Sequence, residues 1–324
     1  MAVKRFITCI AIAFILTQSV LAQSSTTLIV GDNAPEFKVE KWLKGDNSNG
    51  LEKGKVYVID LWATWCVPCI AGMPHLSKLQ QKYKAQGLEI IGMTSEDKWG
   101  NTLQKVETFI KKKDSIMNYS VAWVPASMNK DSLQGIFVHP WMQQIGSMNL
   151  PTAFIIDRNG KIAFIGDPHT IDKPLHDIVN NQYDLSLLKA NYKEALEALK
   201  VLDKFTDALK SNDVPRAISE GKRILEEFTY VKPVTYLAMA DAVPKMKGEP
   251  NAQLLDIALA AGKKGVVLTQ FESPGFLSAL ASVYAAKGDY TQAVITMKTA
   301  ISVSEGGMKE AQLKDLEKYL SLIK

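Results

Sequence analysis

An apolar run at residues 56–62 leads into two cysteines, Cys66 and Cys69, and then into helical spacing over residues 68–86. The run is rich in residues that favour strands and has the length of one buried strand. Pro68 constrains the turn between the two segments and removes one backbone donor. The chain therefore places two thiols at a strand-to-helix junction, and this context constrains their chemistry more than their spacing alone does.

A helix N-terminus offers unpaired N–H groups and partial positive charge, and both stabilise a thiolate. We expect Cys66 at the exposed end of this helix and Cys69 one turn further in, more buried. Two intervening residues let the sulfurs meet across the first turn. Cys66 is then suited to attack a disulfide, and Cys69 to resolve the mixed disulfide that forms.

Other uses of the cysteine pair fit the sequence less well. A zinc site needs a second pair of ligands, and His75, His139, His169 and His176 form no compact pair. Haem attachment needs a histidine directly after the second cysteine, where Ile70 stands. A purely structural disulfide remains an alternative. We expect no metal and no cofactor.

The chain has 324 residues, which suggests two domains, and the character of the sequence changes near residue 183. Residues 31–182 alternate strand-like and helix-like segments, which predicts an α/β domain with a mixed sheet flanked by helices. The expected strands are 56–62, 88–93, 119–124, 153–157 and 161–166, with a hairpin turn at 158–160. The expected helices are 68–86, 102–113, 139–145 and 171–180.

Residues 183–324 show helical spacing with almost no strand signal. Ala217, Ala252 and Ala293 are 35 and 41 residues apart, near the ~34-residue period of tetratricopeptide repeats. Small residues allow close helix approach, and Gly288 with Asp289 makes a turn. We predict an all-α domain of tetratricopeptide-like helix pairs, with an irregular helical bundle as the alternative.

The first 22 residues are typical of an export signal, with Lys4 and Arg5 before an apolar run at residues 6–16. We expect cleavage after Ala22, followed by a lead-in at residues 23–30, and a periplasmic mature chain without a membrane span. An uncleaved anchor is the alternative. Cleavage would also remove Cys9 and leave Cys66 and Cys69 as the only cysteines. The moderate charge requires no nucleic-acid partner.

Residues 31–182 resemble the thioredoxin superfamily and, within it, the exported TlpA/ResA-like thioredoxins. The core of the resemblance is Val58-Ile59-Asp60-Leu61-Trp62-Ala63-Thr64-Trp65-Cys66-Val67-Pro68-Cys69, followed by Gly72-Met73-Pro74-His75-Leu76. A second matching segment is Leu150-Pro151-Thr152-Ala153-Phe154-Ile155-Ile156-Asp157. A weaker one, Gly31-Asp32-Asn33-Ala34-Pro35-Glu36-Phe37, resembles the start of AhpC/TSA and redoxin-type domains.

The resemblance implies a role for each matching residue. Cys66 is the attacking nucleophile and Cys69 the resolving thiol of a redox disulfide. Pro151 is a cis-proline that leaves backbone groups of Leu150 free to pair with a bound client. Asp60 is the buried acid that moves a proton to or from the buried cysteine, and burial raises the pKa of such a group. The client-binding surface comprises Trp65, Val67, Pro68 and Leu150, whereas Trp62 lies in the core.

The resemblance implies a thiol–disulfide oxidoreductase that reduces disulfides of exported client proteins and is itself reduced again by an upstream thiol donor. The same cysteine pair could instead serve an oxidant or isomerase, because these classes differ in how strongly the thiolate is stabilised, and the motif alone does not distinguish them. A peroxidase is disfavoured, since Ala63 and Ile59 occupy the places of the Thr and Pro of peroxiredoxins. A fourth hypothesis makes residues 183–324 a partner-binding module with the redox pair secondary.

Residues 94–149 form a longer segment than a minimal thioredoxin fold needs. They include Trp99, Trp123 and Trp141, and the loop at 127–137 is extra. These aromatic residues could shape substrate entry or simply pack within the loops.

Overall fold

The computed structural model describes residues 28–45, 50–125, 140–143, 150–271, 273–304 and 306–323. The expected signal segment 1–22, most of the lead-in, the 127–137 loop and His139 lie outside these residues. The chain divides into two compact units, Met1–Leu188 and Lys189–Lys324. The boundary expected after residue 182 stays a prediction.

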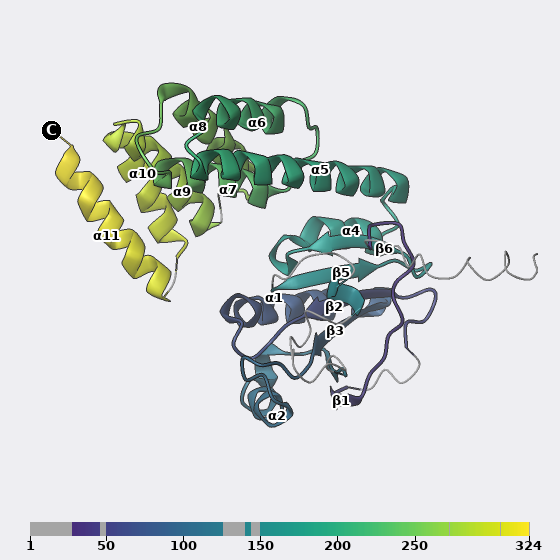
Figure 1. The fold of residues 1–324 in the computed structure, drawn as a ribbon. Helices are drawn as coiled ribbons and strands as arrows, with labels where there is room; N and C mark the ends of the chain where they lie inside the picture. Colours follow the sequence, from purple (N-terminus) through teal and green to yellow (C-terminus); the bar gives the residue numbers. More distant parts are fainter. Residues whose placement is uncertain are drawn as a thin grey trace, which may run out of the picture. The chain divides into compact units, whose positions relative to one another are not determined.

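The first unit contains a six-stranded mixed sheet in the order β1-β4-β3-β2-β5-β6 (Figure 1). Strands β2 (Val56–Leu61), β3 (Leu88–Thr94) and β4 (Ser120–Trp123) are parallel neighbours. Strands β5 (Thr152–Ile156) and β6 (Ile162–Gly166) form an antiparallel hairpin that pairs with β2. The predicted mixed sheet and hairpin are therefore confirmed. The short edge strand β1 (Lys41–Lys44), antiparallel to β4, was not predicted, because its half-exposed residues give no apolar run.

Strand β2 is buried along its whole length, which explains its continuous apolar sequence. Its side chains alternate between the two faces of the sheet. Val56, Val58 and Trp62 join a core cluster with α1 (Val67–Tyr83), α2 (Leu103–Lys112) and α4 (Asp172–Val179). Because of this alternation, the side chain of Asp60 also faces the side on which α1 packs.

The helices begin and end where local chemistry dictates. Helix α1 continues into a 3-10 turn, Lys84–Gln86, and stops at Gly87, whose φ of 84° suits a residue without a side chain. Thr102 caps α2, and the side chains of Val106 and Ile110 are buried. Three further short helices are described in this unit: η2 (Asp114–Ile116), α3 (Pro140–Gln143) and η5 (Pro168–Thr170).

The second unit is helical throughout its described residues, as expected. Its helices are α5 (Leu185–Lys210, which begins in the first unit), α6 (Val214–Glu226), α7 (Pro233–Ala242), η6 (Val243–Lys245), α8 (Ala252–Leu268), α9 (Pro274–Ala286), α10 (Tyr290–Ser302) and α11 (Gly306–Leu322).

Three similar turns of this unit lie between α5 and α6, between η6 and α8, and between α9 and α10. Asn212, Gly248 and Gly288 have φ values of 57°, 91° and 77°, in the left-handed region. The helix that follows each turn is capped by an Asp or Asn side chain, from Asp213, Asn251 and Asp289. The predicted turn at Gly288 is confirmed, whereas assignment to the tetratricopeptide class stays a prediction.

Candidate active site

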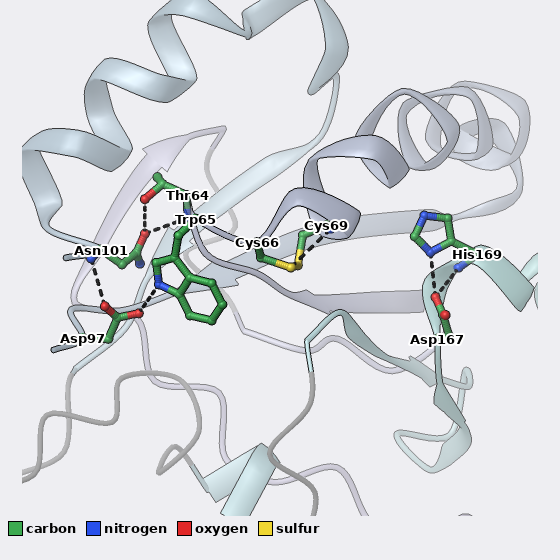
Figure 2. The surroundings of a disulfide bond; sticks show 8 residues. All are labelled: Thr64, Trp65, Cys66, Cys69, Asp97, Asn101, Asp167 and His169. Carbon is green, nitrogen blue, oxygen red and sulfur yellow. Dashed lines mark hydrogen bonds and ion pairs between the residues drawn. A yellow bond between two sulfur atoms is a disulfide. The ribbon is translucent and has the colours of Figure 1, made fainter. Parts of the chain in front are cut away.

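Cys66 and Cys69 form a disulfide, with an S–S distance of 2.00 Å, at the point where the chain leaves the end of β2 and enters α1 (Figure 2). Cys66 is the N-cap of α1, and its sulfur accepts a hydrogen bond from the backbone N–H of Cys69 at 3.3 Å. In this position the sulfur lies against the unpaired N–H groups and the positive end of the helix. This environment favours a thiolate when the disulfide is reduced.

The expected difference in exposure between the two cysteines is wrong for this disulfide form. Cys66 is 3% exposed and Cys69 is 2% exposed. The physical reason is that both cysteines belong to the core cluster of the sheet and α1, so Cys66 is covered although it lies at the helix terminus. The neighbouring side chains remain accessible instead, with Trp65 40% and Val67 74% exposed. Trp65, Val67 and the exposed Pro68 thus surround the sulfurs with an open surface.

A polar network holds the loop before Cys66 in place (Figure 2). Trp65 Nε1 donates to Asp97 Oδ2 at 2.7 Å, and the other oxygen of Asp97 accepts from the backbone N–H of Asn101 at 2.9 Å. Asn101 Oδ1 in turn accepts from the backbone N–H and the hydroxyl of Thr64, at 2.9 and 2.8 Å. Asp97 and Asn101 are buried. The network therefore fixes the indole of Trp65 next to the redox pair.

A cavity of 510 Å³ opens beside this network. Trp65 and Trp99 line it, with ring centroids 5.8 Å apart in an edge-to-face contact. Lys105 and Lys112 of α2 also line it. Trp123 and Trp141, in contrast, are buried. Of these three tryptophans of the long segment, two pack in the core and one shapes the surface next to the cysteines.

The peptide bond between Leu150 and Pro151 is cis, as the resemblance implied. Leu61 of β2 pairs with Thr152 of β5 in the antiparallel register. Pro151 therefore precedes β5 at the same end of the sheet from which the chain runs to Cys66. Leu150 is half-buried and packs against the core cluster. The direct pairing of Leu150 with a client stays a prediction.

Asp60 is 1% exposed, and burial raises its pKa to about 7. Among the described residues, neither of its carboxylate oxygens has a hydrogen-bond partner. The same holds for Trp62 Nε1 and for the hydroxyl of Tyr119, both buried. Gly92, directly opposite Asp60 on β3, lies against both of these side chains, because a Cβ there would be 3.0 Å from Trp62 Nε1 and 3.2 Å from the Tyr119 ring. The predicted buried acid thus lies in a small polar cluster inside the core.

His169 and Asp167 form an ion pair near the first turns of α1, on the opposite side of the disulfide from Trp65 in the view of Figure 2. His169 Nδ1 lies 2.7 Å from Asp167 Oδ1, which also accepts the backbone N–H of His169 at 2.9 Å. The carboxylate raises the pKa of His169. Asp167 directly follows β6, and neither it nor His169 belongs to a motif recognised in the sequence.

The structure thus brings together most of the predicted site residues. Asp60, Trp65, Cys66, Val67, Pro68 and Cys69 follow one another along β2 and α1, and Pro151 comes to the same end of the sheet. The sequence analysis missed Asp97, Asn101, Asp167 and His169. The polar pair Asp97 and Asn101 between a buried strand and the Thr102 cap was an available signal. Asp167 and His169 gave none.

The described residues lack two kinds of feature. They contain no group of three or more His, Cys, Asp or Glu side chains placed to hold a metal ion. None of their helices combines the length and apolarity needed to cross a bilayer.

Comparison with known proteins relates the first unit to redox proteins. Residues 30–165 match the AhpC/TSA family model. Protein FixW of Rhizobium leguminosarum is 28% identical over 165 residues, which cover 50% of this chain and 71% of that protein. Thiol-disulfide oxidoreductase ResA of Bacillus thuringiensis subsp. konkukian (strain 97-27) is 31% identical over 157 residues, covering 48% of this chain and 79% of ResA.

The chain is also similar to solved structures. A thiol-disulfide isomerase from Corynebacterium glutamicum is 19% identical, with a TM-score of 0.38, and covers 46% of this chain and 96% of its own. A thiol:disulfide interchange protein of the thioredoxin family from Chlorobium tepidum TLS is 21% identical, with a TM-score of 0.29, and covers 39% of this chain and 81% of its own.

Proposed function

Because this chain belongs to the ResA-like thiol–disulfide oxidoreductases, with a thioredoxin-like AhpC/TSA domain, we propose that it reduces disulfide bonds of exported client proteins through Cys66 and Cys69. The observation that carries the proposal is the position of Cys66 as N-cap of α1, within bonding distance of Cys69. The basic start and apolar run of residues 1–22 support export to the periplasm.

In the reduced protein the Cys66 thiolate attacks one sulfur of the client disulfide. A bond forms between Cys66 and that sulfur, the client S–S bond breaks, and the other client sulfur leaves as a thiolate. Cys69 then loses its proton and attacks Cys66, which releases the second client thiol. The client gains two electrons, and the protein ends in the disulfide state that the structure contains. An upstream thiol donor would return it to the dithiol.

Asp60 is the group proposed to take the proton of Cys69. A carboxyl group with a pKa of about 7 exchanges a proton near neutral pH without a large driving force in either direction. It also faces the side of the sheet on which α1 and Cys69 pack. The assignment is supported because burial raises the pKa of Asp60 to a value close to neutral pH, where the proton transfer takes place.

The client is proposed to bind on the surface around the sulfurs, formed by Trp65, Val67, Pro68 and the backbone of Leu150. The cavity next to Trp65 extends this surface, and Lys105 and Lys112 give it positive charge. A client segment with an acidic side chain beside its disulfide would therefore be favoured electrostatically.

The experiment that tests the function is reduction of insulin disulfides by the dithiol form, compared with Cys66→Ser. Loss of turnover in this variant is expected, and unchanged turnover would exclude the proposal. A measured reduction potential tests direction, since a value near that of thioredoxin supports a reductant, whereas one near the strong oxidants supports the alternative of an oxidant or isomerase.

The helical unit favours a second role, as a module that holds a partner. Val267, Leu268 and Phe271, at and just beyond the end of α8, are each more than half exposed. Phe271→Asp in the full chain would then weaken action on the true client but spare reduction of a small disulfide. Equal loss of both activities would contradict this role.

A further inference from the structure

A row of small residues crosses the sheet from Asp60 to the edge strand β6. Asp60 pairs with Ala153 of β5, and Ala153 pairs with Gly166 of β6. Paired residues share one face of a sheet, so this row lies on the face that packs against α1. Neither Ala153 nor Gly166 has a side chain beyond Cβ, although the ring of Phe164 lies against Gly166. The row therefore connects Asp60, along one face of the sheet, to the segment that carries Asp167 and His169.

The ion pair of His169 and Asp167 stands directly beyond this row, because Asp167 follows Gly166 in the chain. The imidazole lies against α1 at Gly72, where a Cβ would be 3.2 Å from His169 Nε2. Gly72 is three residues after Cys69, on the next turn of the helix. Since Nδ1 donates to the carboxylate of Asp167, Nε2 is the proton acceptor of the neutral ring, and it faces the protein interior.

Resting on the proposed function, we propose that His169 carries the proton of the resolving step between the buried carboxyl group of Asp60 and solvent. His169 has one edge on the interior at Gly72, and it is 40% exposed on its other side. Asp167 is a positioning residue that orients the imidazole and stabilises its charged form.

The transfer balances without an additional reagent. When Cys69 attacks the mixed disulfide, its proton passes to the carboxylate of Asp60, and the client thiolate leaves. Asp60 then passes the proton, by way of a water molecule, to Nε2 of His169. The imidazolium releases a proton to solvent, and both groups regain their starting forms. The reverse sequence supplies the proton when the disulfide is reduced.

Electrostatic surroundings support this route. Asp60 favours the charged form of His169, and the imidazolium in turn favours the carboxylate of Asp60. Among the described residues, the other titratable side chains that interact with this pair are Tyr119, beside Asp60, and Asp167, beside His169. On α1, His75 is bonded to Asp172 at 2.8 Å, which leaves that imidazole engaged elsewhere.

The test is a single turnover of the reduced full chain with 5,5′-dithiobis(2-nitrobenzoate). The absorbance of the released aromatic thiolate is recorded over time. Attack by Cys66 releases the first thiolate, and resolution by Cys69 releases the second. His169→Ala should leave the first phase unchanged and slow the second by about 100-fold, at the low end of the effect of a general acid–base group. Added imidazole buffer should restore the second phase, whereas the wild-type rate should not depend on buffer concentration.

His75→Ala is the matched control, since it removes another paired imidazole of the same unit. Asp167→Asn should move the pH dependence of the second phase to lower pH, because the neutral amide no longer raises the pKa of His169. A second phase in His169→Ala that equals the wild type, or one that is slow but insensitive to buffer, would overturn the proposal. Absence of the first phase in the wild type would instead refute the oxidoreductase function itself.

Discussion

The backbone N–H of Cys69 donates a hydrogen bond to the sulfur of Cys66 across 3.3 Å, so the resolving residue also stabilises the nucleophile. The bond exists because Cys66 is the N-cap of α1 and Cys69 occupies the first turn. One short stretch of chain therefore supplies the nucleophile, its electrostatic support and the group that later displaces the client.

The first prediction concerns the reactivity of Cys66 in the reduced protein. Iodoacetamide at pH 7 should alkylate Cys66 about ten times faster than free cysteine, because the helix terminus increases its thiolate fraction. Mass spectrometry of the modified protein identifies the site and gives the rate. Cys69 serves as the internal control, and a rate at Cys66 no higher than that of free cysteine would contradict the assigned nucleophile.

The second prediction separates the roles of the two sulfurs. Cys69→Ser should accumulate mixed disulfides with clients, because the attacking sulfur remains and the resolving one is missing. Non-reducing gels of the variant purified from its native compartment should show adducts that dithiothreitol removes. Cys66→Ser is the comparison and should form few adducts. Equal adduct formation by both variants would mean that either sulfur can attack the client.

The third prediction follows from the buried carboxyl group of Asp60. Its pKa rises from 3.8 to about 7 on folding, so between these values the native state holds a proton that the unfolded state has lost. The contribution of Asp60 to stability is therefore greatest at acidic pH and falls as pH rises towards 7. Asp60→Asn, which carries no charge to bury, should be more stable than the wild type by on the order of 4 kcal/mol at pH 7–8.

Urea unfolding of the disulfide form at pH 4 and pH 8 measures this difference. The two proteins should be close in stability at pH 4, because both then have a neutral side chain at position 60. Asp114→Asn, at an exposed carboxylate paired with Lys44, is the control and should change little at either pH. If the wild type were as stable as Asp60→Asn at pH 8, ionisation of the buried Asp60 carboxyl group would not destabilise the folded protein, which would contradict the prediction.

Much of the first unit could be predicted because its signals are local. The buried strand at residues 56–61 shows a continuous apolar run, and Thr102 marks the start of α2 by its capping side chain. Strand β1 carries no such signal, since its place in the sheet depends on pairing with the distant β4. The cysteine junction followed from the apolar run and the helical spacing on either side of it, whereas the buried Asp60 and the cis bond before Pro151 followed from motif resemblance.

The missed site residues depend on contacts between segments far apart in sequence. Asp97 meets Trp65 only because the loop after β3 returns to the end of β2. His169 meets α1 only because β6 closes the hairpin beside β5. Likewise, the exposure of Cys66 was misjudged because a helix terminus is open in isolation, whereas here the disulfide lies in the core. Tertiary packing, not local propensity, decides each of these cases.

The fourth prediction concerns the network before Cys66. Asp97→Ala removes the acceptor for Trp65 Nε1 and for the backbone N–H of Asn101, and the second of these is buried. Leaving a buried donor unpaired should destabilise the protein by about 1–3 kcal/mol. Loss of this hydrogen bond from the indole should raise KM for a client more than it lowers kcat, because the cysteines themselves are untouched. Thermal unfolding and insulin kinetics measure these two effects. An unchanged KM would show that client binding does not depend on the hydrogen bond between Trp65 and Asp97.

The last prediction addresses the charge of the cavity beside Trp65. Lys105→Ala with Lys112→Ala should raise KM by about tenfold for a disulfide peptide flanked by Glu and leave KM nearly unchanged when Gln replaces Glu, because only the carboxylate gains from the two ammonium groups. Added salt should likewise raise the KM of the wild type for the Glu-flanked peptide towards its KM for the Gln-flanked peptide, because salt screens the attraction between the charges. Lys111→Ala changes an exposed lysine of the same helix that does not line the cavity, and it should behave as the wild type. Equal KM values for the two peptides in the wild type would mean that the cavity does not distinguish charged from neutral clients. The client-binding surface would then comprise only the residues around the sulfurs.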